Sequence, residues 1–173
     1  MKMLQIALVL MIFGSCSQEK MLKHTGKNFE IFYSASWQKQ EQASAIYFLS
    51  PKENEKDMFQ ENVNLVLQDL SQQPMNLEQY TELSKKQIIE NFGASALVYI
   101  KATTLAGQEA KELVYNMNYQ GRKLKLKQYW FIKGNTAYLF TYTAEPSQYD
   151  KYEKTATEII LSRFINFSRL QSF

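Results

Sequence analysis

The feature that most constrains the fold is a regular spacing of glycines in the second half of the chain. Gly107, Gly121 and Gly134 follow Gly93 at intervals of 14, 14 and 13 residues. Such an interval holds one strand and one tight turn, where glycine is favoured because it readily adopts positive φ angles. Sequential strands joined by tight turns pair antiparallel. The spacing therefore predicts a four-stranded meander, with strands over residues 95–105, 108–119, 123–133 and 136–143.

Two amphipathic helices are predicted, one before and one after this meander. Asn76 caps the first, Gln79 completes a capping box three residues later, and Gly93 marks the end. Ser147 and Asp150 form a Ser-x-x-Asp capping box for the second helix. The apolar stripe of the first helix comprises Leu77, Tyr80, Leu83, Ile88 and Phe92. The residues of the second that we expect to face the sheet are Tyr149, Tyr152, Ala156, Ile159, Ile160 and Phe164.

The first half of the domain is expected to add three strands. Phe29–Tyr33 alternates, Ala45–Leu49 is a short apolar run, and Asn62–Leu70 places three apolar residues on one face. The charged segment Lys52–Gln60 has no clean period and is expected to be a loop. A hydrophobic content of 45% and a charged content of 21% fit one globular domain and exclude intrinsic disorder. The predicted fold class is α+β, with an antiparallel sheet of about seven strands flanked by two helices in an α/β/α sandwich.

The N-terminus has the pattern of a secretory signal. Met1–Ser15 contains one lysine, the ten-residue apolar segment Leu4–Phe13 and two small residues. An apolar segment of this length matches a signal peptide and is too short to span a membrane. We therefore expect residues 1–15 to be removed on export.

Cys16 is the only cysteine in the chain and follows this signal directly. Phe13-Gly14-Ser15-Cys16 resembles a bacterial lipobox, in which the thiol receives a diacylglyceryl group before cleavage. Acylation also caps a thiol that is a liability in an oxidising compartment; the alternative is a stray cysteine beside an ordinary cleavage site. The polar residues 17–27 are expected to form a tether. Serine, not aspartate, follows the cysteine, which favours the outer membrane if the host has two membranes.

The order of strands, helices and meander also matches a known family. The segments that carry the match are Phe29–Tyr33 with Trp37, Asn62–Val66, Gly107–Tyr115, Ala137–Ala144 and Tyr149–Phe164. Through these segments the domain at residues 28–173 resembles the PsbP-like fold, in particular the DcrB-type bacterial lipoproteins. The resemblance implies a mostly non-enzymatic group, which includes a subunit of the oxygen-evolving complex, envelope lipoproteins and cytoplasmic chaperone adaptors. The signal peptide argues against the adaptor role.

The sequence lacks the common catalytic and cofactor motifs. The six glycines are too widely spaced for any phosphate-binding loop, and the one histidine and one cysteine exclude His-pair and Cys-based metal sites. We therefore expect no cofactor, no metal and no enzymatic activity. The rival hypothesis is an envelope hydrolase built on carboxylates such as Glu109, Glu112 and Glu145.

Two charged segments are candidate binding regions. As a strand, residues 122–129 place Lys123, Lys125, Lys127 and Tyr129 on one face, which is either a solvated surface or a basic strip for an anionic ligand or partner. The acidic residues Glu53, Glu55, Asp57 and Glu61 lie in or beside the predicted loop and fit a solvated loop better than a cation site.

Taken together, these features predict a lipid-anchored cell-envelope protein with a binding, assembly or envelope-maintenance role. A purely structural lipoprotein is the other alternative. The expected partners are the membrane, through the anchor, and an envelope protein or anionic ligand. A net charge of +3 is too small to indicate nucleic-acid binding.

Overall fold

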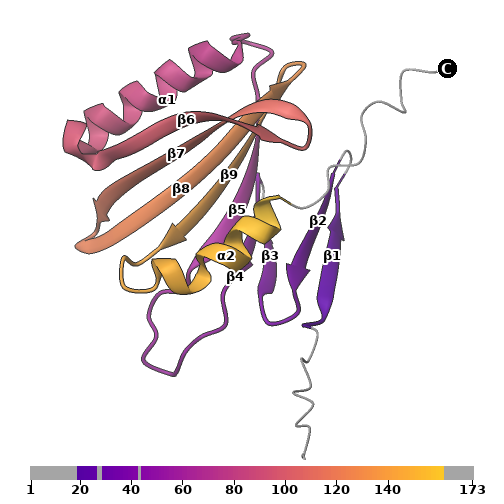
Figure 1. The fold of residues 1–173 in the computed structure, drawn as a ribbon, viewed down its shortest axis with the longest axis vertical. Coiled ribbons are helices and arrows are strands. Elements are labelled where there is room, and N and C mark those ends of the chain that lie inside the picture. The colour runs from indigo at the N-terminus through magenta and orange to yellow at the C-terminus, as the bar shows by residue number, and fades with distance from the viewer. Residues whose placement is uncertain (1–18, 27–28, 43, 162–173) are drawn as a thin grey trace, which may run out of the picture.

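A seven-stranded antiparallel sheet organises the computed structural model, which describes residues 19–26, 29–42 and 44–161 (Figure 1). The strand order is β3-β4-β5-β9-β8-β7-β6, and a separate two-stranded sheet pairs β1 with β2. The strands of the large sheet are β3 (Gln38–Gln42), β4 (Ala45–Leu49), β5 (Asn62–Asp69), β6 (Leu97–Leu105), β7 (Gln108–Tyr119), β8 (Arg122–Lys133) and β9 (Thr136–Ala144). The remaining elements are β1 (Met21–Thr25), β2 (Glu30–Ser34), α1 (Leu77–Phe92), the short 3-10 helix Ala94–Ala96 and α2 (Tyr149–Ile160).

The predicted meander is confirmed. Strands β6 to β9 are neighbours in sequence order, and each pair is antiparallel. Ala106 and Gly107 both have positive φ, as do Gln120 and Gly121. Two consecutive residues with positive φ match the right-handed twist of a hairpin, which explains why the glycines mark these turns.

Helix α1 begins and ends where the sequence predicts. The Asn76 side chain accepts a hydrogen bond from the Gln79 backbone N–H at 2.9 Å, and the Gln79 side chain accepts one from the Asn76 N–H at 3.0 Å. The buried side of α1 packs on one face of the sheet, where Trp130 Nε1 donates to Thr81 Oγ1 at 3.2 Å. The capping box therefore stabilises a helix that covers half of the core.

The start of α2 differs from the prediction. Gln148, not Ser147, is the N-cap residue, and no side chain caps the helix. Gln148 is helical itself (φ −107°, ψ −9°) and its N–H bonds to Glu145 O, so a tight turn leads directly into the helix. The predicted inward face is otherwise confirmed for its five described residues, Tyr149, Tyr152, Ala156, Ile159 and Ile160; Phe164 lies outside the described residues.

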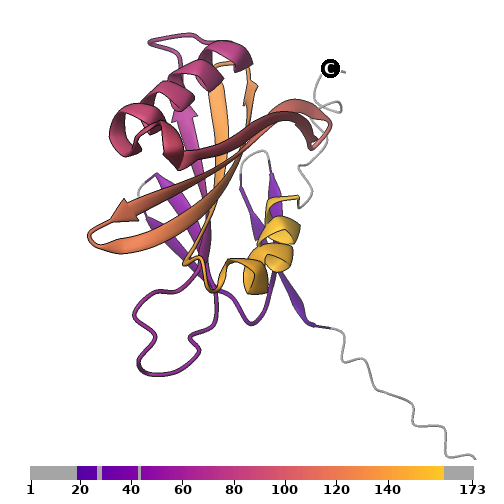
Figure 2. The same ribbon diagram turned by 60° about the vertical axis from the view of Figure 1, so that its left-hand side comes forward.

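Helix α2 and the β1–β2 pair cover the other face of the sheet. Along β8, Trp130 packs with the α1 side while Phe131 packs with the α2 side, as expected for alternating strand residues. The Trp37 ring meets the Tyr152 ring edge-on, with centroids 6.0 Å apart. Figure 2 shows the two helices on different sides of the twisted sheet. This is the predicted helix–sheet–helix arrangement, with a small sheet added beside α2.

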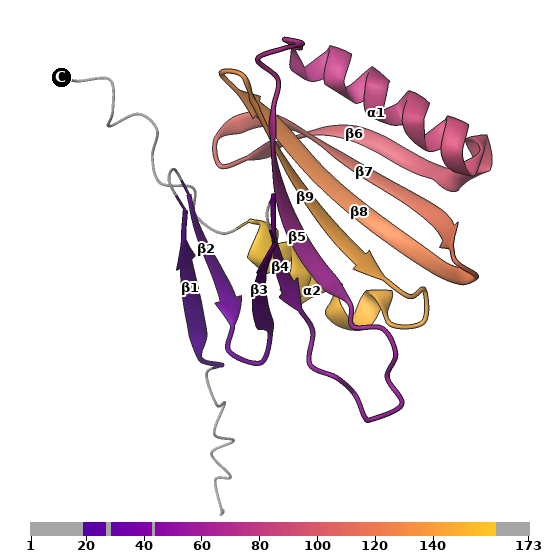
Figure 3. The same ribbon diagram turned by 180° about the vertical axis from the view of Figure 1, so that it is seen from behind.

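The N-terminal part differs most from the sequence prediction. Residues 21–25, expected to belong to a tether, form β1 and pair with β2, which lies in the small sheet and not in the large one (Figure 3). The seventh strand of the large sheet is instead β3, which was not predicted. The signal peptide and Cys16 lie outside the described residues. Within the described part of the chain, no helix is long and apolar enough to cross a membrane.

Candidate functional site

The predicted basic strip on β8 is not a continuous solvated face. Alternation along the strand is confirmed, because Leu124 and Leu126 pack on the α1 side and Tyr129 on the α2 side. Lys127, however, is only 9% exposed, and Tyr129 is buried as well. Lys127 contacts Glu153 of α2, and Tyr129 lies in the same core cluster as the buried residues of that helix. A single basic docking surface along β8 is therefore not present: of the four predicted residues only Lys123 is exposed, and Lys125 is half-buried.

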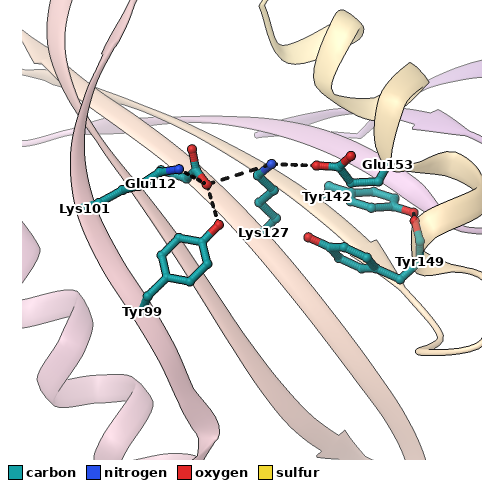
Figure 4. Close-up of polar contacts among 7 residues, drawn as sticks. All are labelled: Tyr99, Lys101, Glu112, Lys127, Tyr142, Tyr149 and Glu153. Carbon is teal, nitrogen blue, oxygen red and sulfur yellow. Dashed lines mark hydrogen bonds and ion pairs between the residues drawn. The ribbon is translucent and has the colours of Figure 1, made fainter.

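Lys127 instead belongs to a cluster of polar side chains between β6, β7, β8 and α2 (Figure 4). Glu112 on β7 is the centre of this cluster: its Oε1 accepts a hydrogen bond from Tyr99 at 2.5 Å and an ion-pair contact from Lys101 Nζ at 3.1 Å. Lys127 Nζ lies 3.8 Å from the same oxygen and 2.7 Å from Glu153 Oε1 on α2. Two carboxylates thus face two ammonium groups, and the cluster joins α2 to the sheet.

The electrostatics of the cluster fix its charges near neutral pH. Burial opposes ionisation of Glu112, but hydrogen bonds from Tyr99 and Lys101, with the charge of Lys127, lower its pKa below the usual 4.5. Burial likewise disfavours the charged lysine, yet the bond to Glu153 and the charge of Glu112 raise the pKa of Lys127 above 10.5. Burial and the bond to Glu112 raise the pKa of Tyr99 to about 12. Near pH 7 the acid stays ionised, the lysine charged and the tyrosine protonated.

Three more tyrosines, Tyr129, Tyr142 and Tyr149, lie beside this cluster, and Lys127 Nζ is 5.4 Å from the centre of the Tyr129 ring. Tyr142 Oη donates to the Tyr149 carbonyl at 2.8 Å, and Lys125 Nζ lies 3.8 Å from the centre of the Tyr149 ring. Burial raises the pKa of Tyr129, Tyr142 and Tyr149. A lysine over an aromatic face is stabilised by the ring quadrupole. The cluster is therefore held together by charge and hydrogen bonding, and the pKa values of Glu112, Lys127 and Tyr99 are all shifted away from neutrality.

The three carboxylates of the hydrolase hypothesis have separate surroundings. Glu109 is exposed near the β6–β7 turn, and Glu112 is held in the cluster described above. Glu145, after β9, pairs with Arg122 at the start of β8. The structure thus gives Glu112 and Glu145 different cationic partners and does not bring them to a common one.

The acidic loop contains one buried carboxylate. Glu61 is only 2% exposed, and its Oε1 accepts a hydrogen bond from the Glu145 N–H at 3.3 Å. Burial raises the pKa of Glu61, whereas backbone hydrogen bonds from Glu53 and Phe59 lower the pKa of Asp57. Glu53 pairs with Lys151, a contact between the loop and α2. The prediction of a solvated loop is therefore correct for residues 51–56, which are exposed, and wrong for Glu61, which is buried.

This loop borders a cavity of about 540 Å³, and Arg122 and Glu145 line both it and a neighbouring cavity of about 510 Å³. The Arg122 guanidinium also lies over the Phe59 ring at 5.1 Å. In the described ranges no group of three or more His, Cys, Asp or Glu side chains is placed to hold a metal ion. The carboxylates that border the cavity are thus bonded within the protein.

Sequence reasoning missed several members of these sites. Tyr99, Lys101 and Glu153 come from two other elements, and only the pairing of β6 with β7 and the docking of α2 bring them to Glu112. A local signal existed for one of them, because Glu153 lies one helical turn after Tyr149 and so shares its face.

Comparisons with known proteins define the fold. No family model and no curated protein matches the sequence. Among solved structures, PA94, a protein of unknown function from Pseudomonas aeruginosa, has a TM-score of 0.62 at 16% identity, over 84% of this chain and 97% of its own. CyanoP, the cyanobacterial PsbP of Synechocystis, has a TM-score of 0.55 at 12% identity, over 87% and 95%. LpqN of Mycobacterium tuberculosis, described as involved in cell envelope biogenesis, has a TM-score of 0.55 at 12% identity, over 83% and 87%.

At identities this low the similarity concerns the fold alone. The chain has a PsbP-like fold, as its sequence predicts. The closer resemblance to DcrB-type lipoproteins stays a prediction.

Proposed function

We propose that this protein is a lipid-anchored protein of the bacterial cell envelope that binds a partner and catalyses no reaction. The observation that carries the proposal is the position of Cys16. It is the only thiol in the chain, and it follows a signal-like apolar segment and two small residues.

Two further observations support an envelope role. LpqN, which shares the fold, is described as involved in cell envelope biogenesis. More than one acyl chain is needed for stable anchoring, and a diacylglyceryl group carries two. Serine after the cysteine favours the outer membrane in a host that has two membranes.

The polar cluster supports the non-enzymatic part of the proposal. Glu112 and Lys127 neutralise each other and are fixed by neighbours, so their role is to lock α2 onto the sheet. A general acid or base works best with a pKa near the working pH, and neither group is shifted in that direction.

The anchor is tested by fractionating cells that express the full chain. The wild type should sediment with membranes and require detergent for release, whereas Cys16→Ala should be released by aqueous buffer. Ser17→Ala is the matched control, because it changes a neighbouring residue and spares the thiol. Membrane retention of Cys16→Ala equal to that of the wild type would overturn the proposal. A crosslinking pull-down that compares the two forms would then identify partners met only by the anchored protein.

A further inference from the structure

Residues only three and four positions after the proposed lipid site are already bonded to the domain. The Glu19 side chain accepts hydrogen bonds from Ser34 and, at 2.9 Å, from Ser36. The Lys20 carbonyl accepts one from the Ala35 N–H at 2.8 Å. The chain is thus fixed to the β2–β3 turn from residue 19 onward. Only three residue steps separate Cys16 from Glu19, which span at most about 10 Å when fully extended.

A connection this short restricts how the domain can be oriented relative to the membrane. We propose that one particular end of the domain is a lipid-contacting surface, held against the membrane by the lipid on Cys16. This membrane-proximal end comprises Lys20, the turn Ser34–Trp37 and the loop Pro51–Gln60. The proposal rests on the lipidation of Cys16 stated above and adds which surface meets the bilayer.

Strand pairing places these segments at one end of the molecule. Met21 lies opposite Ser34, Gln38 opposite Leu49, and Leu49 opposite Asn62, so the start of β1, the β2–β3 turn and the β4–β5 loop share one end. In Figures 1 and 3 this end is the lower one, and α1 lies at the opposite end of the long axis. Anchoring at Cys16 therefore directs α1 away from the membrane.

The chemistry of this end suits a lipid surface. Met58, in the loop, is 82% exposed, more than any other large apolar side chain in the described residues. A flexible apolar side chain gains from entering the interfacial region of a bilayer. Lys20, Lys52 and Lys56 are exposed at the same end and can approach phosphate groups.

Two acidic side chains of the loop, Glu53 and Asp57, bind groups within the protein. Glu53 pairs with Lys151 of α2, and Asp57 accepts hydrogen bonds from the Glu53 and Phe59 N–H groups. Their charges are thus partly compensated within the protein, which reduces repulsion from anionic lipid. This end, and not the partly buried lysines of β8, is the surface that the anchor presents to the bilayer.

The test is amine footprinting of the anchored protein. Full-length protein purified with its lipid is placed in vesicles of phosphatidylethanolamine and phosphatidylglycerol, and lysines are acylated with a membrane-impermeant reagent and read by mass spectrometry. Lys20, Lys52 and Lys56 should lose reactivity relative to the same protein in detergent. Lys86 on α1, exposed at the far end, should not. Equal protection of Lys86 and Lys52, or no protection at either, would overturn the proposal.

Two variants separate the roles of the loop and of the short connection. Met58→Glu should restore the reactivity of Lys52 and Lys56, whereas Leu83→Glu, a matched change of an exposed apolar residue on α1, should leave it unchanged. A spacer of about ten glycine and serine residues before Glu19 should restore the reactivity of Lys20, since it extends the reach severalfold. Unchanged protection in both Met58→Glu and the spacer variant would contradict the proposed surface.

The lipidation of Cys16 and the orientation of the domain can fail separately. The mass of the Cys16 peptide reports the native lipid and so tests the proposed function alone. If that peptide carries no lipid, a diacyl maleimide attached to Cys16, the only thiol in the chain, still allows the footprint to be measured. Protection of Lys20, Lys52 and Lys56 would then support the lipid-contacting surface even without the native anchor.

Discussion

Lys127 provides the sharpest test of how the structure holds together, because the sequence alone suggested an exposed lysine. It is buried between Glu112 and Glu153, at 3.8 and 2.7 Å. Removing one partner of a buried ion pair typically costs about 3–5 kcal/mol, because the other charge is left uncompensated. Glu112 would keep Tyr99 and Lys101 as partners, so we expect Lys127→Met to lower the free energy of unfolding by about 3 kcal/mol, the low end of that range.

The assay is urea denaturation of the mature chain carrying Cys16→Ala, followed by circular dichroism. Lys123→Gln is the matched control: it changes an exposed lysine on the same strand and should shift the stability by no more than about 0.5 kcal/mol. Combining Lys127→Met with Glu112→Leu should cost less than the sum of the single changes by about 1 kcal/mol or more, because the residues are coupled. A loss below about 1 kcal/mol for Lys127→Met, as for an exposed pair, would refute the buried ion pair.

Three further predictions concern Glu61, Glu112 and the helix caps. The pKa of Glu61 is raised above 4.5 in the folded state, so the stability that the protonated carboxyl contributes at low pH is lost as the pH rises. The urea midpoint of Glu61→Gln relative to that of the wild type should therefore be higher at pH 7 than at pH 4. The same difference between the two midpoints at both pH values would contradict this. The pKa of Glu112 is lowered, so the stability that its charge contributes is present above about pH 4.5 and is lost as the pH falls further; the stability of Glu112→Gln relative to the wild type should therefore be lower at pH 7 than at pH 3, and the opposite trend would count against the cluster. Asn76→Ala should lower the free energy of unfolding by about 1 kcal/mol, whereas Ser147→Ala should change it by less than about 0.5 kcal/mol; equal effects would contradict the assigned caps.

The parts of the fold that local sequence determines were predictable. The β7–β8 turn needs positive φ at Gln120 and Gly121, and the glycine signals it. The capping box at Asn76 acts within four residues, so its pattern is visible without any tertiary contact. Signals of this kind act through the backbone alone and are not altered by what packs nearby.

The edges of the fold were less predictable. β3, with the sequence Gln-Lys-Gln-Glu-Gln, has no apolar alternation, because it is an edge strand with mostly exposed side chains. Polar side chains protect such an edge against further pairing, and they also hide the strand from pattern reasoning. β1 likewise alternates only between exposed and half-buried positions, so its sequence carries no clear strand pattern and residues 21–25 were predicted to belong to a tether.

The polar cluster around Glu112 and Lys127 could not be predicted from the sequence. Alternation correctly placed Lys127 and Tyr129 on one face of β8, but it could not show that α2 covers that face. The partner Glu153 lies 26 residues away, and the contact exists only after the helix docks. Burial of a charge is a tertiary property, which one strand alone cannot reveal.

The central claim, that a lipid on Cys16 holds the protein in the envelope, is tested most directly by the mass of its N-terminal peptide. Protein extracted from membranes with detergent is digested, and the peptide that contains Cys16 is analysed by mass spectrometry. The account predicts a chain that begins at Cys16 and carries a diacylglyceryl group on its sulfur. A peptide that begins at another residue, or a Cys16 with no lipid in the membrane-derived protein, would contradict it.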